Sequence, residues 1–430
     1  MILSLSKWSF LLLIFSLPLI RPFNTDLFGL QVPYTDFIFL ASSGFWALAV
    51  LRKETLVRSD RLFIFIGLYA LTFVISTILS VDPKTSFFKL LGEFYLFSLC
   101  FLTFNLIDNV EFLRRVIIAW LGGTVLTIVS FLAGIVLFYV GYKTKNDNYF
   151  LSHLGSLPAG DYPRIRALFE NANMLCNFLN VSIVLTLLAE KLGWIKKRAA
   201  IVLAVGILAA ALFSISPGIG GIALTLGIWF GVKFSKISGR RLAIPALVFG
   251  TAISLAVFGS TLVSPDTNNT SQDINVPVID KIVEPSVRVL VWQDTVQTIR
   301  QFPWLGKGTG MDVAHIEYVT LSGDKQDLYD AHNMWLNVAG QTGLIGLTAF
   351  LILLIYLFKR CSFKIKEGID GEYIHLALSC ALVGAFFYQG LAGSYEDTRH
   401  IWVLIGILAA YSVPASMASK NDILTVPKMP

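Results

Sequence analysis

Charged residues are scarce in this 430-residue sequence. They make up 14% of it, while hydrophobic residues make up 55% and the mean hydropathy is +0.69. A soluble domain carries nearer a quarter charged residues, so this composition excludes an ordinary soluble fold. Apolar runs of about 20 residues recur along the whole chain, and each is long enough to cross roughly 30 Å of hydrocarbon as a helix. We therefore predict an all-α, polytopic transmembrane helical bundle.

Residues that hold metals or form disulfides are also few. The four cysteines lie in or beside apolar runs without ligand or disulfide spacing, and we expect them to be core thiols. The acidic trio Asp324, Asp327 and Asp330 stands without clustered histidines, so a solvated acidic run is favoured over a metal site. We find no internal repeat and no low-complexity tract. The sequence thus predicts no cofactor, no metal and no nucleic-acid partner.

We expect about twelve spans, with ends uncertain by several residues. They cover residues 8–21, 34–51, 62–80, 87–106, 113–140, 172–190, 199–215, 217–233, 242–263, 333–358, 373–393 and 400–417. The division between the seventh and eighth spans rests on Ser216-Pro217-Gly218, a pattern that also kinks single helices.

The basic residues orient the bundle. Most lysines and arginines fall at the termini and in every second loop, so the positive-inside rule predicts that both termini are cytoplasmic. The longer loops, residues 141–171 and 264–331, then lie outside. We divide the chain into membrane helices (1–263), a large outer loop (264–331), and the last three helices with a cytoplasmic tail (332–430). Within the large loop we expect a helix from Pro285 to Gln301. Pro303 and the Gly306–Gly310 turn are expected to end this helix.

The large loop offers few cations. It holds ten acidic and five basic residues, so an anionic substrate would depend on specific side chains. Arg288 and Trp292 are four residues apart and share one face of the expected helix. Arginine can fork two hydrogen bonds onto a phosphate, although an arginine that snorkels to the headgroups is the alternative. The Gly306–Gly310 segment, with Lys307, resembles a phosphate cradle, but a plain turn is the favoured interpretation because the setting of a P-loop is missing.

A histidine stands where this polar loop meets the tenth span. His332 is preceded by Asp330 and followed by Asn333, either of which can cap the helix or orient the imidazole. A neutral histidine accepts a proton from a hydroxyl near neutral pH, which favours a general base; a polar cap on the span is the alternative. The glycines of this span, at positions 340, 343 and 346, are expected to permit close helix packing.

Three further arginines are expected on the same outer face. Arg164 and Arg166 precede Asn171-Ala172-Asn173 at the entry to the sixth span, and Arg399 lies in a charged turn with Glu396, Asp397 and His400 before the last span. An ordinary interfacial role is the favoured interpretation for each.

These residues resemble the superfamily of O-antigen ligases and O-antigen polymerases. The resemblance is carried by His332-Asn333 followed by Gly343-x-x-Gly346, which is similar to the family's signature at the end of its periplasmic loop. The segments Arg288 to Trp292 and Phe302 to Gly308 resemble the family's loop helix and proline-glycine turn. The part of the chain that resembles the family most specifically runs from Arg288 to Gly346 and covers about 60 residues. Arg166 with the Asn171 segment adds a weaker resemblance.

The resemblance implies a metal-independent, inverting glycosyltransferase of the bacterial inner membrane. Its donor would be an undecaprenyl-diphosphate-linked glycan, and its acceptor a glycolipid or glycan. His332 would deprotonate the acceptor hydroxyl and Arg288 would hold the diphosphate, with Asn333, Trp292 and Asp330 in support.

One position departs from the family pattern. Pro217 stands in the turn between the seventh and eighth spans, where the family often carries an arginine. A second phosphate-binding cation must then come from elsewhere, and Arg166, Lys307 and Arg399 are the candidates. We expect an O-antigen ligase, with lipid A-core as acceptor, ahead of a polymerase. A solute transporter of the bicarbonate type is the alternative from another class; it would need paired broken helices with ionisable residues at the midplane, and the charges here gather at span ends.

Overall fold

The computed structural model describes most of the chain. The described residues are 1–20, 24–27, 30–140, 151–157, 160–235, 247–248, 250–251, 274–276, 281–283, 287–319, 325–363, 370–393 and 398–411. Most of the expected ninth span, Pro285, Asp324, Glu396 and Asp397 lie outside these residues.

Helices dominate the described residues. They are α1 (Ile2–Ser16), α2 (Tyr34–Leu51), α3 (Leu62–Ile78), α4 (Pro83–Leu106), α5 (Val110–Tyr139), α6 (Ala172–Lys191), α7 (Lys197–Phe213), α8 (Ile219–Ser235), α10 (Val287–Gln301), α11 (Met334–Arg360), α12 (Asp370–Ala392) and α13 (Arg399–Tyr411). The expected helix in the large loop is confirmed as α10. The expected separation of the seventh and eighth spans is also confirmed, because α7 ends at Phe213 and α8 begins at Ile219.

The strands form short antiparallel pairs. Within the described residues each strand pairs with one neighbour, so no larger sheet competes with the helices. The pairs are β1 (Asn24–Leu27) with β2 (Leu30–Pro33), β3 (Leu151–Leu157) with β4 (Gly160–Ile165), β5 (Ile274–Val276) with β6 (Lys281–Val283), and β7 (Ile316–Val319) with β8 (Lys325–Leu328).

The helices have the length and composition of membrane spans. Among the described residues, six helices are long and apolar enough to cross a bilayer: α2, α4, α5, α6, α11 and α12 up to Leu391. The helices α1, α3, α8 and α13 are apolar but shorter. The chain is therefore a multi-pass helical membrane protein, while the count of twelve spans stays a prediction.

Short polar side chains fix where several helices begin. Asp82, Asn109 and Asn171 each accept a hydrogen bond from a backbone N–H in the first turn of α4, α5 and α6. Pro83 occupies the first turn of α4, where its missing N–H costs no hydrogen bond. The α4 and α5 helices consequently begin at residues 83 and 110, a few residues before the expected 87 and 113, because hydropathy does not register a polar first turn.

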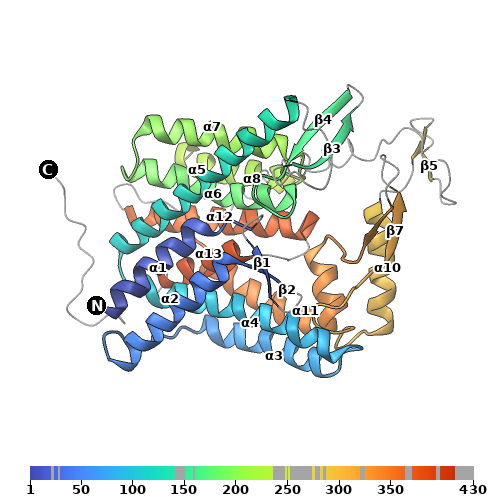
Figure 1. Cartoon of the computed structure of the whole chain (residues 1–430), viewed down its shortest axis with the longest axis horizontal. Coiled ribbons are helices and arrows are strands. Elements are labelled where there is room, and N and C mark those ends of the chain that lie inside the picture. The colour runs from blue at the N-terminus through green and yellow to red at the C-terminus, as the bar shows by residue number, and fades with distance from the viewer. Residues whose placement is uncertain are drawn as a thin grey trace.

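The helices pack around one apolar interior. The neighbours are α1 with α2 and α5, α4 with α13, α3 with α11, and α12 with α6 and α8. Figure 1 shows α10, β7 and the β3–β4 pair toward one end of the long axis, away from residue 1. The polar segments on which the candidate chemistry falls therefore gather at the same end of the bundle.

The tenth expected span is interrupted. Gly343, inside α11, has a left-handed, non-helical backbone with φ 70° and ψ −174°. The segment that follows α10 fills the break: Leu344 N–H donates to Pro303 O (2.8 Å), and Ile345 N–H donates to Trp304 O (3.3 Å). The span expected over 333–358 is therefore present as α11 with a break at Gly343, and this glycine packs against a loop instead of a neighbouring helix.

Because of this break, we expect any side chain at position 343 to lower the stability of the folded chain strongly. A Cβ there would overlap the Trp304 carbonyl, and the left-handed backbone alone costs a non-glycine residue about 1–2 kcal/mol. We expect Gly343→Ala to destabilise the folded chain by more than about 2 kcal/mol, measured as a lower thermal midpoint of the protein in detergent. The control is Gly67→Ala in α3, where a Cβ meets nothing within 4 Å. Equal midpoints for the two variants would contradict this account.

Candidate functional site

The site is built at the first turn of α11. Asn333 caps this helix, because its Oδ1 accepts hydrogen bonds from Trp335 N–H (3.0 Å) and Leu336 N–H (3.3 Å). Its Nδ2 donates to the carbonyl of Gly390 in α12 at 3.0 Å. One amide side chain therefore begins α11 and fastens that beginning to α12. The expected capping role falls to Asn333, which leaves the imidazole of His332 outside the cap.

Asp330 holds His332 from the loop side. The Asp330 Oδ1 accepts the His332 backbone N–H at 2.6 Å and lies 3.2 Å from Nδ1 of the imidazole. His332 has a left-handed backbone with φ 44°, a conformation uncommon outside glycine. The two side chains are 26% and 24% exposed, so the pair is open to a substrate while being held by the protein. The carboxylate therefore lies against both the backbone and the ring of His332.

Two side chains fix the residue before the histidine. Trp292 Nε1, from α10, donates to the carbonyl of Ala331 at 2.8 Å, and the Ala331 N–H donates to Asn337 Oδ1 at 2.9 Å. Ala331 is fully buried between these contacts. The structure thus brings Trp292, Asp330 and Asn333 together around His332.

Arg288 lies in α10, one turn before Trp292. Its side chain lies outside what the structure describes, so its role stays a prediction.

The Gly306–Gly310 turn is packed against the broken helix. The Lys307 N–H donates to Gly340 O (2.8 Å), the Gly308 N–H donates to Gln341 O (3.1 Å), and the Gly310 N–H donates to Gln341 Oε1 (3.0 Å). These donors are already engaged by α11, which fits the plain turn better than the phosphate cradle. The Lys307 Nζ donates to the Asp312 carbonyl at 2.8 Å, so this cation lies beside the turn.

The other two candidate arginines are anchored by neighbouring segments. Arg166 Nη1 donates to the Glu170 carbonyl at 3.4 Å, just before α6. Arg399 donates to Thr35 Oγ1 at 2.9 Å and lies 3.5 Å from Asp36, at the start of α2. Arg399 thereby joins α13 to α2, a contact that favours the interfacial alternative for this residue.

Arg164, which was expected with Arg166 as an interfacial group before the sixth span, contacts a turn that is distant in sequence. It extends from β4 to the turn between α7 and α8, where its Nε donates to the Ser214 carbonyl at 3.0 Å. Its Nη2 donates to Asn173 Oδ1, also at 3.0 Å. An arginine from a different segment thus lies beside the turn in which Pro217 departs from the family pattern. No sequence signal reveals this, because 50 residues separate Arg164 from Ser214.

A comparison with known protein families finds a match over the region that contains His332. Residues 178–351 match the family model described as O-antigen ligase. The match begins within α6 and ends within α11, so it includes Arg288, Lys307 and His332 and leaves Arg164, Arg166 and Arg399 outside. No curated protein matches the chain.

The two contacts of Asn333 are separable by mutation. Asn333→Ala removes the cap, worth about 1 kcal/mol, and the hydrogen bond to Gly390, worth about 1 kcal/mol. Asn333→Ser keeps a capping oxygen and loses the N–H donor to Gly390. We expect the alanine variant to lose roughly twice the thermal stability of the serine variant, measured by thermal unfolding in detergent. Equal losses in both variants would show that the cap contributes nothing.

Proposed function

We propose that this chain, whose residues 178–351 match the family model described as O-antigen ligase, transfers a glycan from undecaprenyl diphosphate to an acceptor hydroxyl. The family is one of ligase- and polymerase-type glycosyltransferases, and it implies lipid-linked glycan and glycolipid substrates. The reaction takes place on the periplasmic face of the bacterial inner membrane, with both termini cytoplasmic. The large loop over 264–331 and the start of α11 supply the reacting groups.

The geometry around His332 is the observation that carries this proposal. The Asp330 carboxylate lies beside Nδ1, so an Nδ1–H that donates to it leaves Nε2 as the nitrogen that accepts a proton. A carboxylate in this position also stabilises the imidazolium that forms on proton transfer. Trp292 and Asn333 hold the backbone on both sides of the ring. This arrangement supports a general base.

The transfer is an inverting displacement at the anomeric carbon of the donor glycan. The acceptor oxygen forms a bond to the anomeric carbon as the bond from that carbon to the diphosphate oxygen breaks. The acceptor proton passes to His332, and the bonding electron pair leaves with the diphosphate. Negative charge grows on the leaving group, so a fixed cation nearby lowers the barrier. We assign that cation to Arg288, and in this scheme protein side chains supply both the base and the charge without a metal.

Arg164 is our candidate for the second cation. Its guanidinium lies against the α7–α8 turn that contains Pro217, where the resemblance leads us to expect an arginine. A purely structural role, in which Arg164 joins the α7–α8 turn to Asn173, is the alternative. Arg164→Lys separates the two: loss of transfer at an unchanged thermal midpoint supports binding, while a lower midpoint with normal transfer supports the structural role.

Lipid A-core is the proposed acceptor, which makes the chain an O-antigen ligase. The motif from His332-Asn333 to Gly346 favours it over an O-antigen or exopolysaccharide polymerase, while the family match is compatible with both. A transporter is not favoured. In the described residues the interrupted helix α11 is filled at its break by the Pro303–Gly310 segment, and no charged residue lies between Asn333 and Tyr356.

Removal of the base should abolish transfer. We expect His332→Ala to lower glycan attachment to the acceptor by about 10²–10⁴-fold, the usual contribution of a positioned acid or base. Attachment is measured in cells and with purified protein, donor and acceptor.

Added imidazole distinguishes a base from a structural histidine. It should restore a fraction of the activity of His332→Ala, and the thermal midpoint should match that of the wild type. Transfer at the wild-type level would remove the base assignment.

The leaving-group cation has a matched control in its own helix. Arg288→Ala should abolish transfer without impairing membrane insertion, and Arg288→Lys should retain a fraction because lysine keeps the charge but loses the fork. Arg300, exposed in the last turn of α10, is the control, and Arg300→Ala should transfer normally. Undiminished transfer by Arg288→Ala would remove the proposed role.

A further inference from the structure

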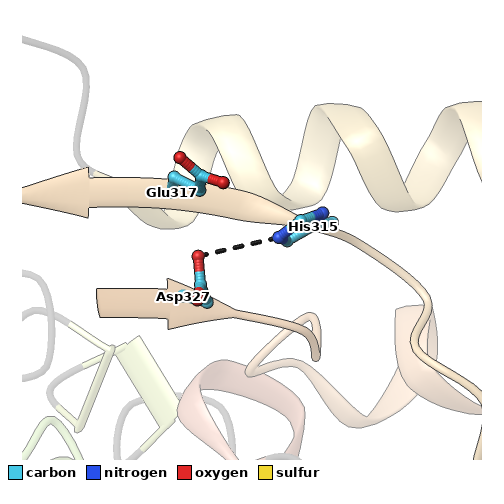
Figure 2. A group of neighbouring side chains, drawn as sticks. All are labelled: His315, Glu317 and Asp327. Atoms are coloured by element: carbon cyan, nitrogen blue, oxygen red, sulfur yellow. Dashed lines mark ion pairs between the residues drawn. The ribbon is translucent and has the colours of Figure 1, made fainter. Parts of the chain in front are cut away.

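A second group of polar side chains lies on the β7–β8 pair, apart from the residues assigned to transfer. One ligand atom from each of His315, Glu317 and Asp327 lies within 4.8 Å of the other two. Figure 2 shows the three side chains gathered beside the paired strands, with the His315–Asp327 ion pair dashed. We propose that these three residues bind a divalent cation of the zinc type.

Strand register places the two carboxylates together. Glu317 and Asp327 are direct partners across β7 and β8, so both project from the same face. His315 precedes Glu317 by two residues, and the alternation of an extended chain puts it on that face too. Like charges directly opposite one another destabilise a strand pair, so this arrangement favours a bound cation.

The histidine is held in place from two sides. Its backbone N–H donates to Asp294 Oδ2 of α10 at 2.8 Å, and its ring stacks on Tyr329 with centroids 5.1 Å apart. The side chains of His315 and Asp327 are 57% and 42% exposed. An ion can therefore reach the site from water, and the imidazole is already fixed for it.

The charge around the group is negative. The group holds two carboxylates, those of Glu317 and Asp327, beside one imidazole, and the Asp294 carboxylate accepts the backbone N–H of His315. An exposed ion pair between His315 and Asp327 contributes little by itself. The two carboxylates carry more negative charge than a single imidazolium would neutralise. A doubly charged cation would therefore balance the charge of the group.

The distances and atom types select the kind of ion. His315 Nε2 and Asp327 Oδ1 are 3.6 Å apart. Neighbouring ligands in a tetrahedral zinc site, at bond lengths of about 2.0–2.2 Å, are separated by about 3.4 Å. One imidazole nitrogen with two carboxylates suits zinc, whereas magnesium and calcium prefer all-oxygen sites. Three protein ligands leave one position for water or an anionic group.

The test measures zinc bound to the full-length chain in detergent, without a polyhistidine tag, by equilibrium dialysis at micromolar Zn²⁺. The four cysteines are buried and do not compete. We expect about one zinc per chain. Loss of even an outer partner of a metal ligand costs about 10–100-fold in affinity, so His315→Ala, Glu317→Gln and Asp327→Asn should each weaken binding at least tenfold.

Two controls separate this site from others. Glu111→Gln changes an exposed carboxylate of α5, and His332→Ala removes the proposed base; both should bind zinc as the wild type does. Because binding is read without transfer, its failure leaves the proposed function standing, and the reverse also holds. No zinc bound by the wild type, zinc binding unchanged in all three ligand variants, or magnesium binding as strong as zinc would overturn the proposal.

Discussion

The rest of the structure depends on the exchange of backbone hydrogen bonds between the broken helix α11 and the segment that follows α10. A break at Gly343 leaves carbonyls before it and N–H groups after it without helical partners. The loop supplies both kinds: Lys307 and Gly308 donate to the carbonyls, and Pro303 and Trp304 accept from the N–H groups. An unpaired backbone group in an apolar interior costs about 1–3 kcal/mol, so neither segment is stable in this form without the other.

The exchange explains how a polar loop comes to position a histidine at a membrane helix. The segment through Gly310 is anchored to α11 and also to α3, where Thr309 donates to Phe73 O; Ser76 of α3 in turn donates to Gln341 O of α11. The loop helix α10 is thus fixed at its carboxyl end, and Trp292 within it reaches the Ala331 carbonyl. His332 is held by contacts that originate in α10, α11 and α12, and no single element determines its place.

Much of this organisation was predictable from residue order, and the rest was not, for identifiable physical reasons. The long spans are set by local hydropathy, so their existence followed from the sequence, as did the helix ending at Gln301. The break at Gly343 was not predictable, because a glycine in an apolar run has the same appearance in a continuous helix. Asp330, His332 and Asn333, at the start of α11, were predictable as neighbours in sequence. By contrast, Arg164 at Ser214 and His315 at Asp327 meet only through tertiary contact or strand register.

The interlocking of the Pro303–Gly310 segment with Gly343 has a consequence for engineering and for divergence of the chain. A boundary placed at residue 331 looks natural in the sequence, since it divides a polar loop from an apolar helix. In three dimensions that boundary would cut through a single hydrogen-bonded unit. A loop transplanted from a related protein would place a different turn against the helix break at Gly343. A compatible graft must therefore carry residues 303–346 as a single block. The same pairing implies that substitutions near Gly306 and Gly343 are accepted together or not at all.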